Sequence, residues 1–133
     1  MLKGLGSLKS KIKVVSQLET DCDQTKGEQQ AQTMLTANPH LTAIYSACGP
    51  PALGAIQAIQ HAGIKKGGII LVGFDGLPQE VTAVKAGTET ATIQQHPVLE
   101  GSDSLAVLYK AVQGKSVPKD VNTGVSIITP QNA

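Results

Sequence analysis

The sequence lacks tryptophan and has few aromatic side chains: Tyr45, Phe74 and Tyr109. A core without many aromatic rings must be filled by aliphatic residues and alanine, which favours helices packed on a sheet over an aromatic-rich sandwich. The same scarcity argues against a nucleic-acid module, because such modules stack bases on aromatic side chains. We therefore expect an α/β domain that has no nucleic-acid partner.

The sequence also lacks an excess of charge of either sign. Its 133 residues include 11 basic and 10 acidic side chains, for a net charge of +1, which gives no reason to expect nucleic acid or a membrane surface. No apolar run approaches the roughly 20 residues needed to span a bilayer, and the N-terminus lacks the apolar core of a signal peptide. One basic cluster contains no aromatic residue, so we interpret it as a solvated helix face: Lys3, Lys9, Lys11 and Lys13.

Strand-like and helix-like segments alternate along the chain. The run Ile69–Val72 is short, unbroken and rich in β-branched residues, as in strands buried on both faces of a parallel sheet. Regular alternation predicts one domain, residues 1–133, with a doubly wound, mainly parallel sheet and helices on both faces. The expected strands are 12–18, 41–46, 69–74, 90–93 and 125–128, and the expected helices are 25–37, 49–61, 78–86 and 99–113.

Polar side chains follow the expected strands at the points where they end. Asp23, Ser46, Asp75 and Gln95 each occupy such a position. Because the carboxyl ends of parallel strands share one edge, where open α/β sheets bind ligands, we expect these groups to converge. Carboxylate, amide and hydroxyl groups together suit a polyhydroxylated ligand. The alternative is that Asp23, Ser46 and Asp75 cap helices or turns, and the residues alone leave both interpretations open.

Four stretches, in this order and spacing, resemble the periplasmic sugar-binding proteins of the ribose-binding type, whose fold is shared by LacI-like repressors. They are "DCDQTKGEQQAQTMLTANPHLTAIYS", "LTAIYSACGPPALGAIQAIQHAG", "GFDG" and "ATIQQ". The resemblance implies a sugar or polyol ligand, an ABC transporter permease as partner, a periplasmic or cell-envelope location, no cofactor and no catalytic step. It also implies that Asp75 accepts hydrogen bonds from sugar hydroxyls and that Gln95 lies near the hinge between two lobes.

The two cysteines depart from the pattern of this family. Cys22 stands where ribose binders tend to place an aromatic ring that stacks on the sugar, and Cys48 stands where they place an asparagine. A sugar other than ribose, a polyol or a less polar ligand is therefore expected. The family's strand order puts another strand between the two cysteines, about 9.5 Å of separation, whereas a disulfide needs Cα atoms within roughly 7 Å. We accordingly expect free thiols, and no metal site, because C-x-x-C and paired histidine motifs are missing.

The resemblance covers only the C-terminal lobe of a family member, which has about twice this length. It implies that residues 96–124 would pack on the missing N-terminal lobe, with Leu105, Val107, Leu108 and Val112 exposed in this chain. The first strand of the lobe, expected between 12–18 and 41–46, is also missing. We therefore expect a homo-oligomer formed by exchange of strands or segments.

Three other functions remain open from the sequence. The first is the effector-binding domain of a LacI-like transcription regulator. The second is a small redox or other α/β protein that uses Cys22 and Cys48. The third is a structural remnant that oligomerises and binds nothing. Hydrolysis has no candidate residues, because no nucleophile elbow or serine, histidine and acid arrangement is found. His96, next to Gln95, is a further candidate for contact with ligand or with the other lobe.

Overall fold

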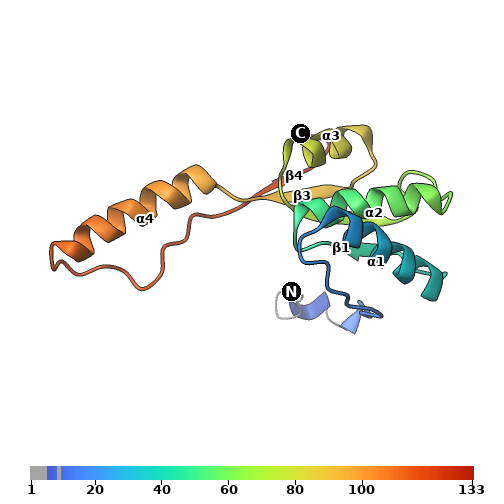
Figure 1. Cartoon of the computed structure of the whole chain (residues 1–133), viewed down its shortest axis with the longest axis horizontal. Coiled ribbons are helices and arrows are strands. Elements are labelled where there is room, and N and C mark those ends of the chain that lie inside the picture. The colour runs from blue at the N-terminus through green and yellow to red at the C-terminus, as the bar shows by residue number, and fades with distance from the viewer. Residues whose placement is uncertain (1–5, 9) are drawn as a thin grey trace.

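The computed structural model describes residues 6–8 and 10–133, in which helices and strands alternate (Figure 1). The predicted order of elements is confirmed for all but the first strand, and so is the mainly parallel α/β architecture. None of the helices in this part of the chain is long and apolar enough to cross a membrane. The elements are α1 (Gln24–Ala37), β1 (Ala43–Tyr45), α2 (Gly49–His61), β2 (Ile70–Asp75), α3 (Pro78–Ala86), β3 (Ala91–Gln94), α4 (Pro97–Val112) and β4 (Ser126–Ile128).

The strands form one sheet in the order β1-β2-β3-β4. β1, β2 and β3 run parallel, and β4 pairs antiparallel with β3. Because the parallel strands follow each other in one direction and crossovers are right-handed, α2 and α3 must cover the same face. The contacts agree: a Cβ on Gly73 of β2 would meet both Ala52 of α2 and Glu80 of α3.

The core lies between this face of the sheet and the helices. Leu71 of β2 is fully buried there, opposite Ile44 of β1, and packs with Ile56 and Ile59 of α2. α1 lies alongside α2, and its Ala31 belongs to the same apolar cluster. The core is therefore aliphatic, as the scarcity of aromatic residues predicts.

The opposite face of the sheet is open. Tyr45, Ile70 and Ile127 alternate with the core residues along their strands and are 42%, 52% and 60% exposed. Helices were expected on both faces, but the sheet-packing helices of the described residues lie on one. The reason is topological, because a second layer requires the strand order to reverse direction, and β1 to β3 do not reverse.

The predicted strand at residues 12–18 is wrong. The segment is irregular, and its apolar side chains, such as Ile12 and Val15, are largely exposed. A strand persists only when its backbone groups are paired, and no described strand lies next to it. β1 therefore forms the edge of the sheet.

α4 extends away from the sheet as an arm, and an irregular segment returns from its end to β4 (Figure 1). None of its residues is buried. The predicted exposure is confirmed for Leu105, Leu108 and Val112, at 68%, 59% and 73%, but not for Val107, which is partly buried. That residues 96–124 pack on another lobe stays a prediction.

Candidate functional site

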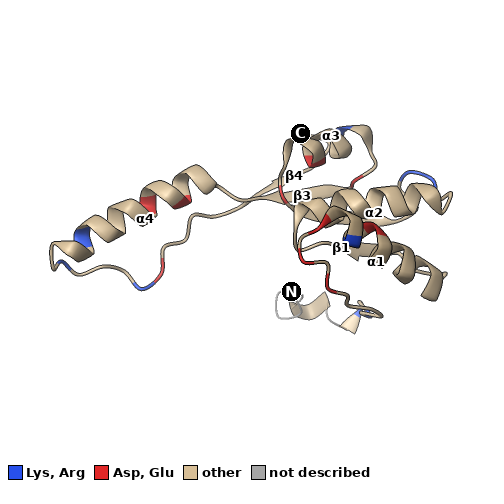
Figure 2. Ribbon diagram, in the orientation of Figure 1, with Lys and Arg blue, Asp and Glu red and all other residues tan. Residues whose placement is uncertain are grey.

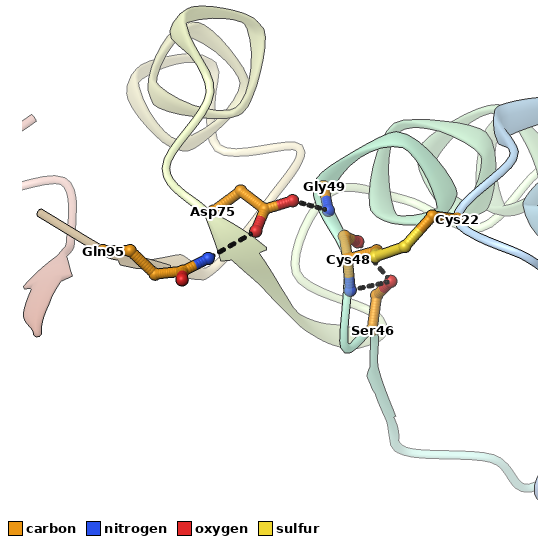
Figure 3. Close-up of a disulfide and its surroundings, with 6 residues drawn as sticks. All are labelled: Cys22, Ser46, Cys48, Gly49, Asp75 and Gln95. Atoms are coloured by element: carbon orange, nitrogen blue, oxygen red, sulfur yellow. Dashed lines mark hydrogen bonds between the residues drawn. A yellow bond between two sulfur atoms is a disulfide. The ribbon is translucent and has the colours of Figure 1, made fainter. Parts of the chain in front are cut away.

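Asp75 is the last residue of β2 and lies at the carboxyl edge of the sheet (Figure 3). Its Oδ2 accepts a hydrogen bond from the backbone N–H of Gly49, at 2.9 Å, and its Oδ1 accepts one from Nε2 of Gln95, also at 2.9 Å. The backbone φ of Asp75 is +100°, a conformation that L residues rarely adopt. The two hydrogen bonds fix the carboxylate in spite of that strain.

The two partners of Asp75 come from different elements. Gly49 is the first residue of α2, where unpaired N–H groups favour a negative charge. Gln95 follows β3, whose last residue, Gln94, is in register with Asp75. The predicted convergence of Asp75 and Gln95 is therefore confirmed. A carboxylate has about four acceptor positions, so both oxygens can accept further hydrogen bonds from a ligand.

The two cysteines form a disulfide, so the expectation of free thiols is wrong. Their Cα atoms are 5.6 Å apart, within the range that a bridge requires. The prediction assumed that a strand keeps them apart, but α1 packs directly beside α2 at this end of the sheet. Asp21 and Cys22 also adopt left-handed backbone conformations, with φ of 51° and 54°, where the chain turns into α1. The bridge therefore joins the start of α1 to the start of α2.

Asp23 and Ser46 serve local structure. Oδ1 of Asp23 accepts a hydrogen bond from the backbone N–H of Lys26, at 2.8 Å, and so caps α1. The Ser46 hydroxyl donates to the carbonyl of Cys48, at 2.6 Å, within the turn before α2. The capping interpretation is thus confirmed for Asp23, and Ser46 stabilises a turn. Nε2 of His96 lies 3.3 Å from the Ser126 hydroxyl of β4.

A polar network beneath the rim was missed by the sequence prediction. Oε2 of Glu80 accepts from the backbone N–H of Leu77, at 2.9 Å, and Oε1 accepts from the Thr92 hydroxyl, at 2.9 Å. The backbone N–H of Gly76 donates to that hydroxyl, at 3.3 Å. These bonds anchor the loop after Asp75. Glu80 occupies the position of the acidic residue in a capping box, but Leu77 stands where that motif has Ser or Thr, so the sequence carries only half of the signal.

Glu89 lies beside this network and had no such signal. Glu89 is 1% exposed, and neither of its carboxylate oxygens has a hydrogen-bond partner among the residues that the structure describes. Burial, followed by the neighbouring charge of Glu80, raises the pKa of Glu89 to about 8. Burial also raises the pKa of Glu80. In the part of the chain that the structure describes, no three His, Cys, Asp or Glu side chains are grouped to hold a metal ion.

Residues 1–116 match the family described as a periplasmic binding protein domain. The chain is 38% identical over 112 residues to the D-allose-binding periplasmic protein of Escherichia coli K12, a match covering 84% of this chain and 36% of that protein. It is 36% identical over 121 residues to the ribose import binding protein of Salmonella typhimurium, a match that covers 91% of this chain and 40% of that protein. The chain thus spans about two fifths of the length of these curated relatives.

Solved structures give the same fold. An ABC transporter solute-binding protein from Agrobacterium vitis with bound D-fucose superposes with a TM-score of 0.86 at 30% identity, covering 98% of this chain and 46% of that one. The glucose-galactose binding protein GanP from Geobacillus stearothermophilus superposes with a TM-score of 0.90 at 24% identity. This match covers 98% of this chain and 46% of GanP. The second likeness supports the fold alone.

Proposed function

The chain belongs to the periplasmic binding protein domain family, and from this membership we propose that it supplies part of a sugar or polyol site in a solute-binding protein of an ABC transporter. Relatives named for D-allose and ribose, and a similar structure that holds D-fucose, support this ligand class. They also favour transport over a LacI-like regulator or a redox protein. The relatives are binding proteins, so we propose no reaction step, and we place the mature protein in the periplasm or cell envelope.

The observation that carries this proposal is the conformation of Asp75. A residue other than glycine held at φ +100° costs on the order of 1 to 3 kcal/mol, and such strain clusters at functional sites. Here hydrogen bonds with Gly49 and Gln95 hold the carboxylate of this strained residue at the sheet edge. Carboxylate and amide groups in contact offer acceptors and donors to neighbouring hydroxyls of a sugar.

In the complete protein, a second lobe would cover this edge of the sheet. Two-lobed proteins gain affinity by enclosing the ligand between both halves, so this chain alone should bind sugar weakly. The Cys22–Cys48 bridge lies close to the rim and is joined to it through Gly49 (Figure 3). We propose that it contributes an apolar surface to the ligand site.

Substitution of Asp75 by Asn should weaken sugar binding by about tenfold, because hydrogen bonds to a charged acceptor contribute about 1.5 kcal/mol or more. Isothermal titration calorimetry with D-allose, D-ribose and D-fucose measures this change. The matched control, Asp120→Asn, removes the same charge from the exposed loop after α4 and should bind like the wild type. Unchanged affinity in Asp75→Asn would exclude Asp75 from the site.

We further propose two protein partners: the transporter permease for the complete protein, and a second copy for this chain. Tyr45, Ile70 and Ile127 leave an apolar sheet face open. α4 carries an apolar face, with Leu105 and Leu108, that packs on none of the described residues. Figure 2 shows few charged residues on α4. Reciprocal packing of α4 on the open sheet face of a second copy would cover both surfaces.

The double substitution Leu105→Glu, Leu108→Glu should convert this dimer to monomer, because charges would enter an apolar interface. Size-exclusion chromatography with light scattering measures the mass. Lys110→Glu is the control, since it changes the net charge equally from the opposite side of α4. A wild type that is monomeric at high concentration would contradict the proposed exchange.

A further inference from the structure

Two buried carboxylates lie on either side of one point in β2. Glu80 is fully buried and Glu89 is 1% exposed. A Cβ on Gly73 would collide with Oε1 of both. Only a glycine at this position therefore leaves room for the two acids to approach the same part of the strand.

Among the described residues of the elements packed around the pair, no positively charged group compensates it. α2 contains no Lys, Arg, Asp or Glu, and its His61 lies at the end remote from the rim. β3 has no charged residue, and Lys85 of α3 is exposed. The remaining charged group near the pair is Asp75, which is also negative and raises the pKa of Glu80 further. Two ionised carboxylates are therefore strongly disfavoured here.

A single proton on the pair removes this conflict. Oε1 and Oε2 of Glu80 already accept hydrogen bonds from Thr92 and Leu77, which favours the ionised form of Glu80. Burial and the neighbouring charge of Glu80 favour the protonated form of Glu89, whose oxygens accept no well-formed hydrogen bond from another described residue. Protonated Glu89 can then donate its O–H to Glu80, whose oxygens retain acceptor capacity.

We propose that Glu80 and Glu89 share one proton and that this proton keeps Glu80 in place to hold the loop that follows Asp75. Glu80 bonds the loop directly through the N–H of Leu77, and Thr92 bonds it through the N–H of Gly76. Both acids are thus positioning residues for the rim. The link to sugar binding rests on the function proposed above, whereas the shared proton does not.

The shared proton makes the stability of the fold depend on pH. The pKa of Glu89 is about 8 in the folded chain, whereas its ordinary value, which applies in the unfolded chain, is 4.5. Between these two pH values the folded state therefore binds more protons than the unfolded state. Stability therefore falls as pH rises from about 4.5 to about 8, and is lowest above 8. The unfolding equilibrium constant should rise by up to about tenfold per pH unit in this window.

The test compares urea unfolding of the wild type and Glu89→Gln from pH 5 to pH 9, without sugar. An amide donates an N–H to Glu80 at every pH, so Glu89→Gln should remove most of the pH dependence and exceed the wild type in stability at pH 9. Amide hydrogen exchange at Gly76 and Leu77 should accelerate above pH 8 beyond the intrinsic rate increase, in the wild type only. Parallel pH profiles in the two proteins would overturn the proposal.

A direct titration covers the case in which Glu89→Gln fails to fold. Carbon-13 NMR of the wild-type Glu side-chain carboxyls should show one buried group that titrates near pH 8. Midpoints below 5 for both acids would overturn the shared proton.

Sugar binding measured at pH 6 and pH 9 then tests the positioning role: affinity should fall at pH 9 in the wild type and not in Glu89→Gln. Absence of sugar binding at both values would contradict the proposed function and leave the proton result standing.

Discussion

Replacement of Cys22 and Cys48 together by serine is expected to lower the free energy of unfolding by about 3.5 kcal/mol. The bridge joins residues 26 positions apart, and a cross-link of this length restricts the unfolded chain on that scale. It also fixes the left-handed turn before α1 against the start of α2. Urea denaturation of the oxidised wild type and the double variant measures the difference.

Reduction provides the control for this prediction. The wild type in excess dithiothreitol should unfold like the double-serine variant, and the variant itself should not respond to the reductant. Thiol titration of the denatured, unreduced wild type should find no free thiol. Two reactive thiols in that titration would show that the bridge does not form and would restore the expectation of free cysteines.

Substitution of Gly54 by alanine should destabilise the fold by about 3 kcal/mol, the upper part of the range for overpacking. α1 and α2 cross so closely that a Cβ on Gly54 would lie 2.6 Å from the backbone nitrogen of Glu28. Backbone atoms cannot rotate away as a side chain can, so the two helices would have to separate. Chemical denaturation measures the loss.

Gly101 provides a matched control for Gly54, because it also lies inside a helix. A Cβ on Gly101 would meet no atom within 4 Å. Gly101→Ala should therefore stabilise α4 by about 0.5 to 1 kcal/mol, the ordinary gain in a helix interior. Equal effects of the two substitutions would mean that α1 and α2 do not make this close contact.

Helix positions were predicted well because their ends carry strong local signals. α2 spans Gly49–His61, as expected from Pro50 near its start and Gly63 after its end. α3 ends at Ala86, with Gly87 in the left-handed conformation. Such signals act within a few residues, so they are present even when distant parts of a fold are not.

The first strand and the cysteine pairing could not be predicted, because both depend on distant segments. Residues 12–18 have the residue types of a strand, but a strand also needs a neighbour, which local sequence does not specify. The distance between Cys22 and Cys48 likewise depends on what lies between the start of α1 and the start of α2. An assumed intervening strand gave the wrong distance.

The candidate site was predictable only in part. Asp75 and Gln95 follow adjacent parallel strands, and this rule placed them in contact. Glu80 and Glu89 are charged residues in a short helix and a loop, positions where acids are usually exposed. Their burial follows from the packing of α3 over Gly73, which the sequence does not reveal.

The proposed function requires that the carboxyl edge of the sheet around Asp75 binds a sugar. The most direct test is an NMR titration of the nitrogen-15-labelled chain with D-allose, following the backbone amide of Gly49 and the side-chain amide of Gln95. Saturable shifts are expected at both amides, because both donate hydrogen bonds to Asp75. They should be lost in Asp75→Asn and retained in Asp120→Asn. Shifts confined to α4 or to the open sheet face, or shifts unchanged in Asp75→Asn, would contradict it.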